Sequence, residues 1–124
     1  MLTTGVDLVE IARVKRIVER YAARFFQRVF TPTEIRYCRG RVPELAARFA
    51  AKEAVSKALG VGVRMMARDG IAWQEVEVVG DERGKPVVHL SGSAAERAAH
   101  LGLTEWSVSL SHTREYAIAF VVAR

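Results

Sequence analysis

The sequence has little cysteine and no long apolar run, and each shortage excludes a class of protein. Cys38 is the one cysteine among 124 residues, so an internal disulfide cannot form. No apolar stretch approaches the roughly 20 residues that a membrane-spanning helix needs. The start, Met1-Leu2-Thr3-Thr4, lacks the basic segment and apolar core of an export signal. We therefore expect a cytoplasmic protein without a membrane partner.

Repeats, low-complexity tracts and linkers are also absent, which predicts a single domain over residues 1–124. The hydrophobic share of 50% is typical of a globular chain rather than a disordered one. Acidic residues are scarcer than basic ones, 14 against 19, which leaves a formal net charge of +5. This excess indicates a polyanionic partner: nucleic acid, a membrane surface, a phosphate-rich cofactor or an acidic protein. Most of the basic residues are arginines, which suit bidentate contacts with carboxylates and phosphates.

The spacing of apolar residues predicts a sequence of strands and helices. Strands are expected at 3–9, 73–79, 85–90, 105–111 and 116–123, and helices at about 10–28, 32–39, 43–59 and 93–101. The last four strands are expected to pair as two hairpins, and residues 61–71, with Met65 and Met66, as a loop without assigned function. This order predicts an α+β fold in which a mainly antiparallel sheet packs against a long helix and shorter helices.

Local signals place the ends of two helices. Thr31-Pro32-Thr33-Glu34 combines a capping threonine, a proline at the first helical position and the glutamate of a capping box. Gly60 is well placed to end the third helix. In the first helix, a stripe at three- and four-residue spacing is expected to face the core: Ile11, Val14, Val18, Ala22 and Phe25.

Two carboxylates and a lysine could form a phosphate-transfer site. Asp7 lies near the end of a strand, where aspartate is uncommon, and Glu53 and Lys57 continue a helical stripe that includes Phe49. Carboxylates can hold Mg²⁺, which typically takes one or two of them, while an ammonium group meets phosphate. Each residue also has an ordinary explanation. Asp7 can cap the next helix, and Glu53 with Lys57 can form a surface pair that contributes about 0.2–0.5 kcal/mol.

Two further features carry charge. The alternating stretch 107–113 ends in His112, which is either an exposed strand-end histidine or a phosphate contact or proton carrier. The first helix has an arginine ridge opposite its apolar stripe, formed by Arg13, Arg16, Arg20 and Arg24. Such a ridge fits a solvated surface, an acidic helix or a phosphate backbone.

Three stretches of the chain resemble the holo-[acyl-carrier-protein] synthase family, the small type of 4′-phosphopantetheinyl transferase. They are GVDLVEIARV at 5–14, RFAAKEAVSKALG at 48–60 and SLSHTREYAIA at 109–119, and GKPVVHL at 84–90 also fits. The stretches follow the family's order and span nearly the whole chain. The resemblance implies the 4′-phosphopantetheinyl transferase fold. It also implies transfer of 4′-phosphopantetheine from coenzyme A to a serine of apo acyl carrier protein, in support of fatty acid biosynthesis.

The resemblance also implies roles for single residues. Asp7 and Glu53 match magnesium ligands, and Lys57 matches a lysine beside the scissile pyrophosphate, so Glu53 and Lys57 are the expected catalytic residues. Besides Lys57, the expected coenzyme A contacts are Arg48, Gly84, Lys85, Pro86 and His112. The expected docking residues for an acidic carrier protein are Arg13, Arg20, Arg24 and Phe25. The family works as a homotrimer with active sites between subunits.

Two alternatives stand beside this interpretation. Net charge and the arginine ridge suggest a basic nucleic-acid-binding module without enzymatic activity. That module leaves Asp7, Glu53 and His112 without a task, and the chain lacks the aromatic-glycine signatures of common RNA-binding modules. The other alternative is a catalytically silent trimeric subunit that only binds carrier protein, and the intact set of Asp7, Glu53 and Lys57 argues against it. We therefore expect no nucleic-acid partner.

Overall fold

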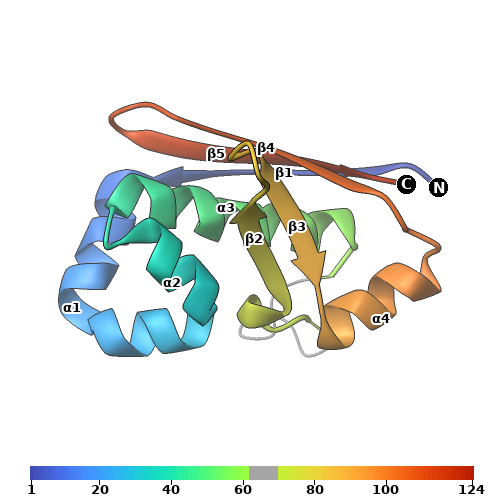
Figure 1. Cartoon of the computed structure of the whole chain (residues 1–124), viewed down its shortest axis with the longest axis horizontal. Coiled ribbons are helices and arrows are strands. Elements are labelled where there is room, and N and C mark those ends of the chain that lie inside the picture. The colour runs from blue at the N-terminus through green and yellow to red at the C-terminus, as the bar shows by residue number, and fades with distance from the viewer. Residues whose placement is uncertain (62–69) are drawn as a thin grey trace.

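The computed structural model describes residues 1–61 and 70–124 (Figure 1). Along the chain lie β1 (Thr3–Glu10), α1 (Ile11–Val29), α2 (Pro32–Cys38), α3 (Val42–Ala58), a 3₁₀ turn (Trp73–Glu75), β2 (Val76–Gly80), β3 (Pro86–Leu90), α4 (Gly92–His100), β4 (Trp106–His112) and β5 (Tyr116–Ala123). Most of the predicted loop 61–71, including Met65 and Met66, lies outside the described residues. Among the helices that are described, none has the length and apolar character needed to cross a membrane.

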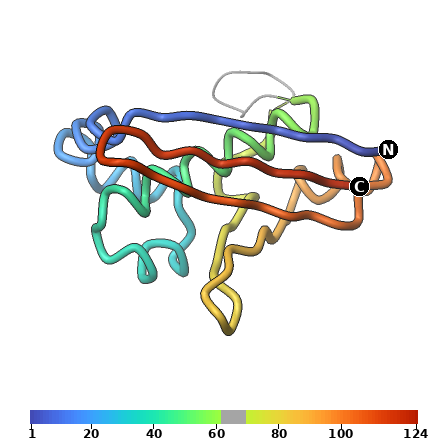
Figure 2. Tube along the Cα trace, turned by 90° about the horizontal axis from the view of Figure 1, so that it is seen from above, coloured from blue at the N-terminus to red at the C-terminus, as the bar shows by residue number. Residues whose placement is uncertain are grey.

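The strands form two antiparallel sheets. In the larger sheet β5 lies between β1 and β4, and Thr3 of β1 pairs with Ala123 of β5. The smaller sheet is the β2–β3 hairpin, in which Val76 pairs with Leu90. Figure 2 shows the three long strands running side by side, and in Figure 1 the helices lie on one side of them. The predicted α+β architecture with antiparallel pairing is confirmed.

Helix α3 packs against the inner face of the three-stranded sheet, and its small side chains allow a close approach. Its buried alanines are Ala46, Ala47, Ala50, Ala51, Ala54 and Ala58. Gly5 of β1 meets this helix so closely that an added Cβ would overlap the carbonyl oxygen of Ala54. Protein interiors are packed too densely to absorb such an overlap. The contact therefore fixes how α3 sits beneath β1.

The opposite face of this sheet is apolar and exposed. We call it the outer sheet face, and its large side chains are Val6, Leu8, Tyr116, Ile118 and Phe120, which are 37–60% exposed. They alternate with inward residues such as Val9 and Ala119, as the period of two requires. A contiguous apolar surface of this kind is typical of an interaction site.

Helix α1 differs from the sequence prediction in its second half. The backbone of Tyr21 is non-helical, with φ −131° and ψ 27°, so the helix is kinked there. The kink changes the direction of the rest of the helix axis. Ala22, which was expected in the core, is exposed. Ile11, Val14 and Phe25 are buried as predicted. A constant helical period cannot be extended across a kink.

The predicted strand at 73–79 begins three residues later than expected. Trp73–Glu75 forms a 3₁₀ turn, and β2 starts at Val76. The side chain of Glu75 accepts a hydrogen bond from the amide of Ala72, at 2.6 Å, which closes the turn. Trp73 stacks on Phe49 of α3 with ring centroids 4.9 Å apart. This tertiary contact and the local hydrogen bond of Glu75 favour the turn over the strand that the alternating pattern predicts.

The capping box at Thr31 forms as predicted, but its glutamate has a second role. Glu34 is fully buried and forms an ion pair with Lys52 of α3, with Nζ and Oε1 2.7 Å apart. Glu34 also accepts from the amide of Val78, and Lys52 donates to the carbonyl oxygens of Trp73 and Val76. Burial lowers the pKa of Lys52, and the charge of Glu34 opposes that shift. The pair joins α2, α3 and β2.

Candidate active site

Helix α3 contributes to two separate cavities. One cavity, of about 780 Å³, is lined by Asp7 of β1, by Glu53 and Lys57 of α3, and by residues of α1. We call it the carboxylate pocket. Phe49 also lines it, so the predicted stripe at four-residue spacing faces this cavity as a unit. The sequence prediction that Asp7, Glu53 and Lys57 come together is in agreement with this arrangement.

Within the carboxylate pocket, Lys57 pairs with Asp7. Its ammonium nitrogen lies 3.0 Å from Oδ1 of Asp7 and donates to the carbonyl oxygen of Val6, also at 3.0 Å. The two charged residues are 50 positions apart in sequence. The local Glu53–Lys57 pair considered above is therefore replaced by a tertiary one. Because the lysine side chain is 53% exposed, solvent screens this pair and the fold gains little from it.

Glu53 is partly buried, and its electrostatic surroundings suit a cation. Burial raises the pKa of the Glu53 carboxyl, and the negative charge of Asp7 raises it further. Lys57 and Arg13 act in the opposite direction. Two carboxylates that repel each other across one cavity are relieved by a bound cation. A donor set of two carboxylates fits Mg²⁺, which fills its remaining positions with water and phosphate oxygens.

The walls of the carboxylate pocket come from both halves of α1. Arg13 and Arg24 line it, and so does Phe25, which is only 8% exposed. Arg20 lies outside the lining residues, and its guanidinium carbon sits 5.4 Å from the ring of Tyr21. Arg28 also lines the pocket, although the sequence prediction omitted it. The signal for Arg28 was its position one turn after Arg24.

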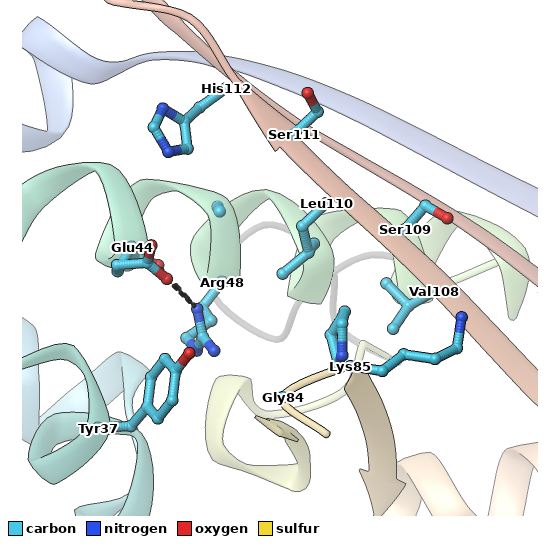
Figure 3. Close-up of a pocket in the computed structure, with 12 residues that line it drawn as sticks. Tyr37, Glu44, Arg48, Gly84, Lys85, Val108, Ser109, Leu110, Ser111 and His112 are labelled. Carbon is cyan, nitrogen blue, oxygen red and sulfur yellow. Dashed lines mark hydrogen bonds and ion pairs between the residues drawn. The ribbon is translucent and has the colours of Figure 1, made fainter. Parts of the chain in front are cut away.

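The second cavity, of about 290 Å³, gathers the other predicted coenzyme A contacts (Figure 3). We call it the arginine pocket. Arg48 comes from α3, and His112 lies at the end of β4. Gly84 and Lys85 come from the turn between β2 and β3, and Pro86 begins β3. Segments far apart in sequence thus bring cationic and imidazole groups to one small cavity, an arrangement that suits a phosphate group.

Short-range hydrogen bonds hold the β2–β3 turn at the edge of the arginine pocket. The carboxylate of Asp81 accepts from the amides of Arg83 and Lys85, at 2.8 and 2.9 Å. Gly84 has φ +81°, which side chains rarely adopt. An aspartate that folds the backbone back on itself is typical of such turns. The turn therefore presents Lys85 in a defined place.

Arg48 is the most buried charged group of the arginine pocket. Its residue is 3% exposed, its Nη1 lies 2.9 Å from Oε2 of Glu44, and its guanidinium carbon lies 4.3 Å from the ring centre of Tyr37. The sequence prediction included neither neighbour. Glu44 could have been found from its position one turn before Arg48 on the same helix. Tyr37 had no local signal, because it belongs to α2.

The two pockets share no lining residue within the described part of the chain. The predicted site residues are therefore divided. Asp7, Glu53 and Lys57 meet in one pocket, whereas Arg48 and His112 meet in the other. A single copy of the chain does not bring both groups into one cavity.

Cys38 has no place in either pocket. It is fully buried in α2, and burial raises the pKa of its thiol to about 11. A buried neutral thiol is unreactive, so its role is in packing.

Comparisons with known proteins agree on one family. The model of the 4′-phosphopantetheinyl transferase superfamily matches residues 3–121. A Herpetosiphon aurantiacus protein named holo-[acyl-carrier-protein] synthase is 52% identical over 124 residues, covering 98% of each chain. A Geobacter sulfurreducens protein of the same name is 48% identical, covering 96% of this chain and 94% of its own.

Two solved structures are also similar to this chain. Helicobacter pylori holo-[acyl-carrier-protein] synthase in complex with coenzyme A has a TM-score of 0.86 and 32% identity, covering 98% of this chain and 99% of its own. The Neisseria meningitidis holo-[acyl-carrier-protein] synthase has a TM-score of 0.86 and 31% identity, with 98% and 97% covered. None of these four names describes a nucleic-acid-binding protein, so that alternative has no support.

Proposed function

This chain belongs to the 4′-phosphopantetheinyl transferase superfamily, and we propose that its two pockets together carry out the transfer reaction. It is a holo-[acyl-carrier-protein] synthase, which moves 4′-phosphopantetheine from coenzyme A to a serine of apo acyl carrier protein, in support of fatty acid biosynthesis. The observation that carries the proposed site is the meeting of Asp7 with Glu53 and Lys57 in the carboxylate pocket. We place the reaction in the cytoplasm, in line with the free thiol of Cys38.

Asp7 and Glu53 would hold a magnesium ion in the carboxylate pocket. Burial raises the pKa of Glu53 and the nearby charge of Asp7 raises it further, and a cation between the two carboxylates would offset both effects. The bound ion supplies positive charge that offsets the charge building up on the pyrophosphate. Lys57 pairs with Asp7 and lines the same cavity, so it can donate a hydrogen bond to the leaving phosphate.

The reaction exchanges one phosphorus–oxygen bond for another. The serine oxygen of the carrier forms a bond to the β-phosphorus of coenzyme A, and the bond from that phosphorus to the bridging oxygen breaks. Adenosine 3′,5′-bisphosphate leaves, and the serine proton passes to Glu53 or to water. Little covalent chemistry falls to the protein, so positioning and electrostatic stabilisation provide most of the rate enhancement.

The arginine pocket would bind a part of coenzyme A that lies away from the reacting bond. Arg48, Lys85 and His112 offer groups that bind phosphate, and the backbone of Gly84 and Pro86 shapes the edge of the cavity.

A homotrimer with active sites between subunits would reunite the two pockets. In one chain they are separate, so a complete site needs the carboxylate pocket of one subunit beside the arginine pocket of another. The outer sheet face supports such an assembly, because Leu8 and Phe120 are 60% and 45% exposed although apolar. Closed cyclic symmetry would bury this face in every subunit alike.

The arginines of α1 would dock the acidic carrier protein. Arg13 and Arg24 line the carboxylate pocket, where the serine must arrive, and Phe25 forms part of its apolar wall. Arg20 would meet the carrier outside the pocket, because it is exposed on the same helix. Positive charge beside the site also speeds the encounter with an acidic partner.

Mass spectrometry of apo acyl carrier protein tests the activity. Incubation with this protein, coenzyme A and Mg²⁺ should add about 340 Da to the carrier, the mass of one phosphopantetheine arm less a serine proton. The carrier alone and the Asp7→Asn variant are the controls and should show no added mass. A wild-type protein that leaves the carrier mass unchanged would contradict the proposed function.

A mixing experiment tests the site between subunits. Asp7→Asn and Arg48→Met chains, each carrying a different tag, are co-expressed and the mixed assembly is isolated. If each site takes Asp7 from one chain and Arg48 from its neighbour, one of the three sites in every mixed trimer is intact, roughly a third of the total. With coenzyme A well below the KM of the Arg48→Met parent, activity above both parents is therefore expected. An assembly no more active than its better parent would show that both pockets act within one chain.

A further inference from the structure

The guanidinium of Arg48 is held on two sides by residues that have no assigned role. Glu44 lies one helical turn earlier on α3, and its Oε2 is 2.9 Å from Nη1 of Arg48. Tyr37, from α2, places its ring centre 4.3 Å from the guanidinium carbon. Figure 3 shows Glu44, Tyr37 and Arg48 together at one end of the arginine pocket, with Lys85 farther along it.

Fold stability does not account for this arrangement. Arg48 is 3% exposed, and its buried Nε has no hydrogen-bond partner among the described residues. Buried polar groups are normally paired, and an exception calls for a functional reason. The guanidinium thus lies buried at the wall of the cavity with part of its hydrogen-bonding capacity unused, a cost that a functional role of Arg48 would explain.

Glu44 is negatively charged, which is unexpected in a pocket proposed to bind phosphate. Among the described residues that line the arginine pocket it is the only acid. A carboxylate repels phosphate, so its presence beside the main phosphate-binding group needs a compensating benefit. The hydrogen bond to Nη1 offers that benefit, because it fixes one edge of a planar group while the ring of Tyr37 fixes one face.

Coenzyme A carries phosphate in two places, the pyrophosphate and the 3′-phosphate. The pyrophosphate holds the scissile bond, so in the proposed function it lies with Asp7, Glu53 and Lys57. The 3′-phosphate is then the group left for Arg48 and Lys85. A doubly charged terminal phosphate suits a preorganised guanidinium, which binds such groups through parallel hydrogen bonds.

We propose that Glu44 and Tyr37 are positioning residues that hold Arg48 for the 3′-phosphate, and thereby set the preference for coenzyme A over 3′-dephospho-coenzyme A. This inference rests on the proposed function for the choice of ligand. It adds a specificity determinant that acts through Arg48 and has no part in the transfer step.

Nucleotide binding tests the inference without carrier protein, metal or turnover. Calorimetry compares adenosine 3′,5′-bisphosphate with adenosine 5′-monophosphate, which differ only in the 3′-phosphate. The wild type should prefer the bisphosphate. Glu44→Ala should weaken bisphosphate binding about 5- to 10-fold, the loss expected for one misaligned charged hydrogen bond, with monophosphate binding unchanged. Glu44→Gln keeps an oxygen acceptor and should retain the preference.

Tyr37 provides a second pair of variants. Tyr37→Phe keeps the ring face against Arg48 and should behave as the wild type does. Tyr37→Ala removes that face and should reduce the preference about threefold, the effect of one partly exposed cation–π contact. Glu96→Ala is the matched control, because it removes one exposed acidic group on α4, outside the pocket. It should leave both affinities unchanged.

Several results would overturn the inference. They are an unchanged preference in Glu44→Ala, an equal loss for both nucleotides, or a Glu44→Gln variant as impaired as Glu44→Ala. A wild type that binds both nucleotides equally would also overturn it, even if transfer to the carrier occurs. A preference that depends on Glu44, in a protein that fails to modify the carrier, would instead uphold the positioning role and reject the proposed function. In the transfer assay, Glu44→Ala should raise KM for coenzyme A with kcat within twofold of the wild type.

Discussion

The carboxylate pocket and the arginine pocket are built on the same helix but suit different tasks. The first is the larger cavity, about 780 against 290 Å³, and pairs two acidic residues with a lysine beneath the apolar wall of α1. The second combines Arg48, Lys85 and His112 with a hydrogen-bonded turn. One set of groups suits a reacting pyrophosphate and its cation, and the other suits a phosphate that is only held.

Helical geometry explains why these tasks are separated in space. Glu53 follows Arg48 by five residues on α3, and five residues turn an α-helix by about 500°, or 140° net. The two side chains therefore leave the helix in different directions. A ligand that contacts both groups must bridge two copies of the chain or reach around the helix. The rigid helix therefore fixes the relative direction of Arg48, which is proposed to hold the ligand, and Glu53, which is proposed to lie at the reacting bond.

Asp7→Asn should give the clearest functional difference between the two pockets, because it should impair transfer and spare nucleotide binding. The variant keeps the shape of the carboxylate pocket but loses a proposed metal ligand. We expect kcat to fall by roughly 10³-fold or more, since electrostatic stabilisation is the main source of rate enhancement in this chemistry. Binding of adenosine 3′,5′-bisphosphate, measured by calorimetry, should stay unchanged. Appreciable transfer by this variant would remove Asp7 from the site.

Lys52→Met should disturb both pockets at once, because Lys52 anchors α3, which contributes residues to each of them. Removing the lysine leaves Glu34 buried without its ion-pair partner, at a cost of about 3–5 kcal/mol in the free energy of unfolding. Urea denaturation followed by circular dichroism measures this loss. Lys15→Met, which alters an exposed lysine on α1, is the control and should be nearly neutral. The double variant with Glu34→Gln should recover much of the stability.

Arg48→Met should have the opposite effect from Asp7→Asn, because it should impair coenzyme A binding and spare the transfer step. Losing hydrogen bonds from a charged donor costs about 1.5–3 kcal/mol, which corresponds to a roughly 10- to 140-fold rise in KM for coenzyme A. We expect kcat to change by less than about threefold, because Arg48 lies away from the reacting groups. Steady-state kinetics at saturating carrier protein measure both constants. A fall in kcat at unchanged KM would place Arg48 in the transfer step.

The smallest expected effect is a shift in the titration of Glu53. Burial and the charge of Asp7 raise its pKa, whereas Lys57 lowers it. In the metal-free protein, Asp7→Asn should therefore move the midpoint to lower pH, and Lys57→Ala to higher pH. Because metal binding needs the carboxylate form, affinity is lost as pH falls through this raised pKa. Carbon-13 shifts of the Glu53 carboxyl measure each midpoint, and shifts of the same sign in both variants would refute this account.

The local parts of the fold could be predicted from particular residues. The capping box at Thr31 and Glu34 starts α2 as expected, and Gly60 follows α3 with φ +71°. The stripe of Phe49, Glu53 and Lys57 faces one cavity, because a helix of constant period keeps such residues aligned. The register of β1 also followed the pattern, with Val6 and Leu8 outward and Val9 inward.

The unpredicted features depend on partners that are distant in sequence. The kink at Tyr21 interrupts the periodic stripe at Ala22, and no proline or glycine at that position predicts it. The buried Lys52–Glu34 pair spans 18 positions, and neither residue carries a local mark of burial. The contact of Tyr37 with Arg48 joins two helices. In each case the energy comes from packing or desolvation that exists only in the folded chain.

Periodicity, capping chemistry and three motifs were enough to predict the architecture and the family, and to propose the residues that carry its chemistry. They rest on interactions within a turn or a strand, which a sequence expresses directly. The division of those residues into two pockets, the pairing of Lys57 with Asp7 and the apolar outer sheet face depended on how α3 packs under β1 and β5. That packing sets directions between elements, and local patterns contain no information about those directions.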